Sequence, residues 1–66
     1  MERIIHEGDR VAVSVGGRTL YGWVDVVDTT DDTVCVAFDH GKRVWHRLSH
    51  VRPVRIGEAG YTGGTT

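Results

Sequence analysis

Short runs in which valines alternate with other residues constrain the fold of this chain more than any other feature. In the first run Val11, Val13 and Val15 are separated by Ala12 and Ser14, and a period of two is typical of a strand that buries one face. Glycine or aspartate stands between most of the later runs, as expected of turns. The runs cover residues 11–15, 20–27, 33–39, 43–48 and 51–56. We therefore predict an all-β fold with five strands.

The alternation also predicts which side chains are buried. The apolar side of the runs is expected to form the core and carries Val11, Val13, Val15, Val24, Val26, Val34, Val36, Phe38, Val44 and Leu48. The opposite side carries Tyr21, Trp23, Asp25, Cys35, Ala37, Arg43, Trp45 and Arg47. Because antiparallel neighbours lie about 4.8 Å apart, the second set should form one outer surface with two tryptophans around small side chains. Pro53 cannot donate to a ladder of hydrogen bonds, so its run is expected at an edge.

The length of the chain limits it to one small domain. Sixty-six residues contain no run with a helical period, and only closure or wrapping lets so few strands hide their edges. We therefore expect a small five-stranded barrel over residues 1–56. Residues 57–66 are rich in glycine and threonine and are predicted to form a flexible tail, with Tyr61 as its only anchor.

The charges are separated along the chain although the formal net charge is only −1. Residues 24–39 hold five acids and no base, whereas residues 40–55 hold five bases and no acid. A lone cysteine, Cys35, cannot form an internal disulfide, which favours a reducing compartment and a cytoplasmic protein. No stretch has the roughly 18 apolar residues of a membrane helix, so no membrane partner is expected.

Several motifs resemble the Tudor branch of the SH3-like small β-barrels over about residues 7–55. They are Gly8-Asp9-Arg10-Val11, Leu20-Tyr21-Gly22-Trp23-Val24, Val34-Cys35-Val36-Ala37-Phe38-Asp39-His40-Gly41 and Leu48-Ser49-His50-Val51-Arg52-Pro53-Val54. The resemblance implies a five-stranded Tudor-like barrel. Tudor domains that read methylated lysine or arginine use an aromatic cage, and the matching positions here are Ser14 or Val15, Leu20, Phe38 and His40. Only Phe38 and His40 can serve, which leaves a residual aromatic pocket rather than a complete cage.

Catalytic and metal-binding chemistry is weakly represented. His40, His46 and His50 fall within eleven residues, but they are expected in two turns and a strand, and no paired cysteines accompany them, so we predict no metal site. We also predict no cofactor. The chain resembles the plasmid-borne dihydrofolate reductase barrels at Gly8-Asp9-Arg10-Val11, which keeps a small oligomeric enzyme as an alternative. Those barrels build their site from a Val-Gln-Ile-Tyr stretch, where this chain has Arg43-Val44-Trp45-His46, so we expect a protein that is not an enzyme.

The outer surface is the strongest functional signal. Arg43, Trp45 and Arg47 should share one face of a strand, beside Tyr21 and Trp23 of another. We predict a non-enzymatic interaction module that docks on a protein or nucleoprotein partner, or on a second copy, through these five residues. Two cations around a ring also suit phosphate contact and base stacking, so a nucleic-acid-binding accessory protein is the alternative. A further alternative explains the two tryptophans without any partner: Ile4-Ile5 or Tyr61 folds back and covers them within the same chain.

Overall fold

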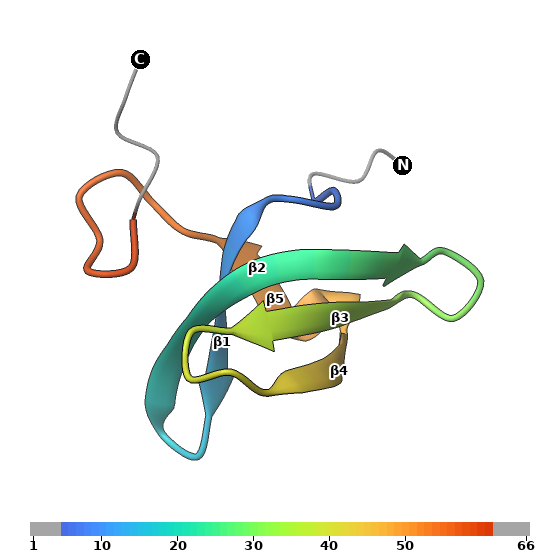
Figure 1. Ribbon diagram of the computed structural model, residues 1–66, viewed down its shortest axis with the longest axis horizontal. Coiled ribbons are helices and arrows are strands. Elements are labelled where there is room, and N and C mark those ends of the chain that lie inside the picture. The colour runs from blue at the N-terminus through green and yellow to red at the C-terminus, as the bar shows by residue number, and fades with distance from the viewer. Residues whose placement is uncertain (1–4, 62–66) are drawn as a thin grey trace.

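The computed structural model describes residues 5–61, which form one antiparallel sheet (Figure 1). The elements are β1 (Arg10–Val15), β2 (Arg18–Asp28), β3 (Thr33–Phe38), β4 (Arg43–Arg47), a 3₁₀ turn η1 (Leu48–His50) and β5 (Val51–Pro53). The strand order is β4-β3-β2-β1-β5. The predicted all-β fold with five strands is therefore confirmed. Within the described residues no helix is long and apolar enough to cross a membrane.

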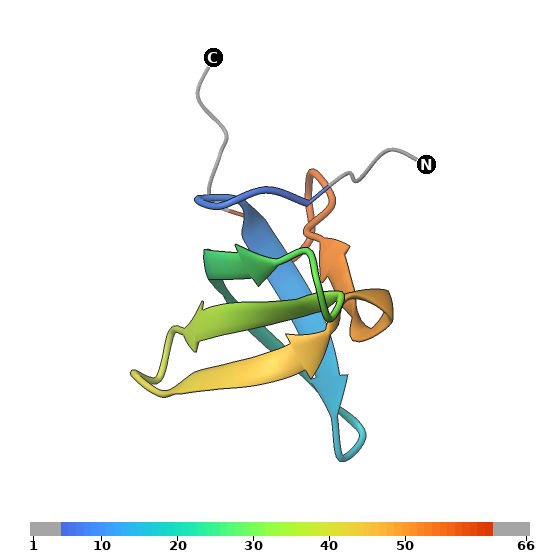
Figure 2. The same cartoon turned by 90° about the vertical axis from the view of Figure 1, so that its right-hand side faces the viewer.

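The sheet curls strongly but does not close into the predicted barrel. β2 is eleven residues long and pairs with β1 in its first half and with β3 in its second. It bends between these halves, so that β3 and β4 cross β1 steeply (Figure 2). β4 and β5 remain the two ends of the sheet, joined by η1 but not paired with each other.

The core lies on the concave side of this curled sheet and matches most of the predicted apolar face. Its buried members are Ile5, Val11, Val13, Val24, Val34, Val36, Phe38 and Val51, with Leu20, Val27 and Leu48 packed against them. Aliphatic β-branched side chains fit a pleated, half-buried surface. The inward assignment of Val24, Val36 and Phe38 is confirmed.

A β-bulge makes one inward assignment wrong. Val24 pairs with Val36 and Val26 pairs with Cys35, so Asp25 of β2 has no partner in β3. An extra residue reverses the alternation. Val26 therefore turns outward, with 38% of its surface exposed, and Val27 takes its place against the core.

Two further valines predicted to be inward are exposed because they lie where the sheet ends. Val44 pairs with the fully buried Val36 but sits on the end strand β4, and 38% of its surface is exposed. Val15 ends β1 beside the turn at Gly16-Gly17 and is also exposed. β5 ends at Pro53 rather than at residue 56, and Ile56 is exposed.

Gly22 shows why one position on β2 carries no side chain. A Cβ placed there would lie 2.6 Å from the carbonyl oxygen of Ala37 and 2.8 Å from a methyl group of Val36. Carbon atoms need about 3.5–4.0 Å. The glycine therefore allows β2 and β3 to approach at the point where the sheet bends.

Candidate functional site

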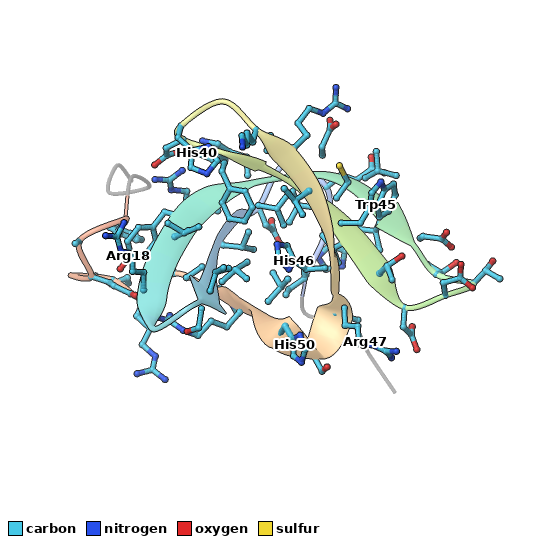
Figure 3. The ribbon with its side chains drawn as sticks, turned by 90° about the horizontal axis from the view of Figure 1, so that it is seen from below. Arg18, His40, Trp45, His46, Arg47 and His50 are labelled. Atoms are coloured by element: carbon cyan, nitrogen blue, oxygen red, sulfur yellow. The ribbon has the colours of Figure 1, made fainter. Side chains whose placement is uncertain are left out.

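The predicted outer surface exists and spans three strands. Its register places Trp23, Ala37 and Arg43 in one row across β2, β3 and β4, and Val26, Cys35 and Trp45 in the next row. Residues directly opposite each other share a face. We call these six residues the outer face. Figure 3 shows Trp45 and His46 on opposite sides of β4, as the alternation requires.

Both tryptophans of the outer face are accessible to solvent. Trp23 has 43% of its surface exposed and Trp45 has 52%, whereas Cys35 between them is buried. Ile5, one residue of the segment that could have covered them, packs instead into the core, and Ile4 lies outside the described residues. Exposed aromatic side chains around a floor of small residues form a surface suited to contact with another molecule.

An ion pair crosses the outer face. The Arg43 guanidinium pairs with the carboxylate of Asp25, which the bulge leaves without a partner in β3. Asp25 raises the pKa of Arg43 through this contact. The alternation alone suggested that Arg43 is a free cation. The structure shows that it is paired with Asp25.

Arg47 lies on the same side of β4 as Arg43 and Trp45, opposite Thr33. Its side chain is exposed. Among residues 5–61 no salt bridge engages it. Arg47 is thus the predicted cation that remains available to a partner.

Trp23 is supported from β1 by Arg10, a residue that the sequence interpretation did not single out. The Arg10 guanidinium lies 5.0 Å from the centre of the Trp23 ring, within range of a cation–π interaction. Its two terminal nitrogens bind the Asp39 carboxylate at 2.6 and 2.7 Å, and this pairing lowers the pKa of Asp39. Its Nε donates to the carbonyl oxygen of Gly60 at 2.8 Å. The signal that could have found Arg10 is its register position opposite Trp23.

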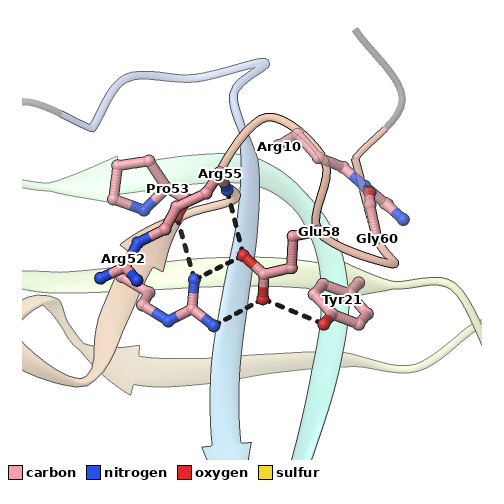
Figure 4. Close-up of polar contacts among 7 residues, drawn as sticks. All are labelled: Arg10, Tyr21, Arg52, Pro53, Arg55, Glu58 and Gly60. Carbon is pink, nitrogen blue, oxygen red and sulfur yellow. Dashed lines mark hydrogen bonds and ion pairs between the residues drawn. The ribbon is translucent and has the colours of Figure 1, made fainter. Parts of the chain in front are cut away.

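Tyr21 is engaged by the C-terminal segment and is not part of the open surface. Its hydroxyl donates to Glu58 at 3.0 Å (Figure 4), and Gly60 is buried against its ring. The two terminal nitrogens of Arg52 bind the Glu58 carboxylate at 2.9 and 2.6 Å. The amide of Arg55 donates a fourth hydrogen bond to the same carboxylate. Contacts with the sheet thus continue into the predicted tail as far as Gly60; residues 62–66 lie outside the described part.

These contacts have a clear electrostatic consequence. Hydrogen bonds from Arg52, from the Arg55 amide and from Tyr21 lower the pKa of Glu58 from 4.5 to about 2. The same carboxylate raises the pKa of the Tyr21 phenol.

The two rings of the predicted aromatic pocket contact each other. Phe38 and His40 stack with centroids 5.4 Å apart, and His46 meets Phe38 edge-on at 5.7 Å. Only 5% of the Phe38 surface is exposed. The Phe38 ring belongs to the core, and the His40 ring stacks on it.

The described residues contain no group of three or more histidine, cysteine, aspartate or glutamate side chains that could hold a metal ion. His46 packs on Phe38 from β4, and His50 lies in η1.

Comparison with known proteins does not assign the chain to a family. No protein-family model matches the sequence, and no curated protein matches it significantly. Functional inference therefore depends on the outer face and its surroundings.

Proposed function

We propose that this protein is a non-enzymatic interaction module, Tudor-like within the SH3-like small β-barrels, that binds a protein partner in the cytoplasm through the outer face. The observation that carries the proposal is the exposure of Trp23 and Trp45 on one side of three paired strands. Tryptophan and arginine are the residues that most often dominate binding energy in protein interfaces. The small side chains of Ala37 and Cys35 lie in β3 between the strands that carry the two rings.

The charges near the outer face favour a protein over a nucleic acid. Asp25 already neutralises Arg43, Asp28 is the last residue of β2, and Asp31 stands in the loop that joins β2 to β3. Nucleic-acid affinity grows with the number of phosphates neutralised, by a salt slope of about 0.9 per contact. With Arg43 paired to Asp25, Arg47 beside the outer face supplies few such contacts.

The surroundings of Phe38 argue against recognition of methylated side chains. Cation binding in an aromatic cage needs ring faces open to the ligand. Here His40 covers one face of Phe38, and His46 packs against the ring. The proposed partner surface is therefore the convex side of β2, β3 and β4, and not the region around Phe38 and His40 at the end of β3.

Capture from an extract of the host, with and without nuclease, tests the proposal. Captured proteins are identified, purified and titrated against the wild-type chain, Trp45→Ala and Ile56→Ala, the last as a matched change at an exposed apolar residue outside the outer face. We expect nuclease-resistant binding that Trp45→Ala weakens by about 2 kcal/mol or more and that Ile56→Ala leaves unchanged. Binding that disappears with nuclease, or that tolerates Trp45→Ala, would contradict the proposal.

A further inference from the structure

β4 has one edge that no other strand covers. It pairs with β3 alone and stands at the end of the sheet, and Figures 1 and 2 show it as the outermost strand beside β3. An unpaired strand edge presents a row of amide and carbonyl groups that another chain can bind. The bulge of this sheet lies on β2, and β4 contains no proline. The backbone of β4 is therefore regular enough to accept a further strand.

The hydrogen bonds at the two ends of β4 identify the groups on the open edge. The amide of Phe38 donates to the carbonyl of Lys42, and the amide of Leu48 donates to the carbonyl of Asp32, both at 2.8 Å. Backbone groups in an antiparallel ladder alternate between the two sides of a strand. The even-numbered residues of β4 therefore point their backbone groups towards β3, and Arg43, Trp45 and Arg47 point theirs outward. No other described residue donates to or accepts from these outward groups.

The side chains of the same three residues determine which strand would fit. Arg43, Trp45 and Arg47 lie on the side of β4 that faces outward, so an added strand would place alternate side chains beside a cation, a ring and a cation. Residues 40–55 contain no acid, and Arg47 has no salt bridge among the described residues.

We propose that the open edge of β4 binds an extended acidic peptide segment of the partner by strand addition. The segment would carry a carboxylate opposite Arg47 and an apolar side chain opposite Trp45. Main-chain hydrogen bonds give affinity in this mode, and alternate side chains give specificity. The inference depends on the proposed function, because it names the kind of protein segment that the outer face and the adjoining edge of β4 recognise.

A second copy of this chain fits the edge less well. In the two-fold arrangement that pairs all three outward residues, Trp45 faces itself and Arg43 faces Arg47 of the other copy. Like charges directly opposite each other destabilise a strand pair. Asp25 offsets one cation of each such pair, but no salt bridge within residues 5–61 engages Arg47. The same charge that opposes self-pairing attracts an acidic strand.

A titration of the isotope-labelled protein with synthetic peptides tests the inference by NMR. The probe is acetyl-Thr-Glu-Thr-Leu-Thr-Glu-Thr-amide, whose second, fourth and sixth residues would face Arg43, Trp45 and Arg47. We expect the amide signals of these three residues to shift and their hydrogen exchange to slow. Replacing both glutamates by lysine, or methylating the leucine amide nitrogen, should abolish the shifts, because the first removes the charge match and the second removes the central backbone donor.

Two variants at one position separate the edge backbone from the side-chain charge. Arg47 has φ −66° and an extended ψ of 142°, values that proline adopts without strain. Arg47→Gln and Arg47→Pro both remove the cation, but only Arg47→Pro also removes the outward amide. We expect Arg47→Pro to bind the peptide about tenfold more weakly than Arg47→Gln, as the loss of one hydrogen bond predicts.

Three results would overturn the inference: no shift with the glutamate peptide, equal binding of the lysine peptide, or equal affinity of the two Arg47 variants. The methylated peptide gives the same backbone test on unaltered protein if Arg47→Pro does not fold. If the peptide fails while a captured partner still binds and is lost with Trp45→Ala, only the strand-addition inference falls.

Discussion

Replacement of Phe38 by alanine tests the assignment of the core most sharply. The ring is almost completely buried, belongs to the valine cluster, stacks on His40 and meets His46 edge-on. Truncation of a buried phenylalanine costs about 3–5 kcal/mol. At about 0.05–0.15 kcal/mol per residue, a chain of 66 residues has roughly 3–10 kcal/mol in total. We therefore expect Phe38→Ala to lose roughly a third or more of the free energy of unfolding.

Urea unfolding followed by circular dichroism measures this change. Phe38→Leu keeps most of the apolar volume and should lose less stability than Phe38→Ala. Trp45→Ala alters a half-exposed residue and should lose less still. A loss of only about 1 kcal/mol in the free energy of unfolding of Phe38→Ala would lie below the range expected for a buried ring. Phe38 would then line an open pocket, and the core assignment would be wrong.

Three further predictions follow from the backbone, the C-terminal segment and the charges. Gly22→Ala forces a Cβ to within 2.6 Å of the Ala37 carbonyl oxygen and should cost about 1–3 kcal/mol in urea unfolding; an unchanged midpoint would contradict the register. Because the pKa of Glu58 falls from 4.5 to about 2 on folding, its contribution to stability is full above 4.5 and is lost as the pH falls through about 2. The free energy of unfolding of Glu58→Gln should not show that loss between pH 4.5 and about 2. Equal slopes of this free energy against pH in the wild type and the variant would refute the prediction. A labelled oligonucleotide at low salt should not bind, whereas binding with a steep salt dependence would favour the nucleic-acid alternative.

The sequence predicted the strands and most of the core because side-chain alternation is a local property. A period of two at Val11 and Val13, and again at Val34, Val36 and Phe38, needs no knowledge of the partner strand. The outer face followed from the same rule, since the residues opposite the core positions include both tryptophans.

The errors arose where distant or neighbouring strands decide the outcome. The bulge at Asp25 depends on how β2 fits β3, and it turned Val26 outward. Val44 has the correct face but lies at the end of the sheet, where no further strand covers it. Strand order, and hence exposure at an edge, is not encoded in the alternation of a single run.

The ion pairs were not predictable for a similar reason. Glu58 joins Arg52 and Tyr21 through hydrogen bonds that span up to 37 positions of the chain. Its surrounding sequence is typical of a solvated tail. Arg10 likewise meets Asp39 only because β1 and the end of β3 both lie beside β2.

The most direct test of the outer face uses the indole signals of its two tryptophans, the only ones in the chain. Each gives one Nε1–H resonance, which can be followed by NMR while the partner identified by capture is added. We predict that both resonances shift as the complex forms, and that neither changes when the protein alone is diluted. If the partner bound and shifted other signals while both indole resonances stayed unchanged, the outer face would not be the binding surface.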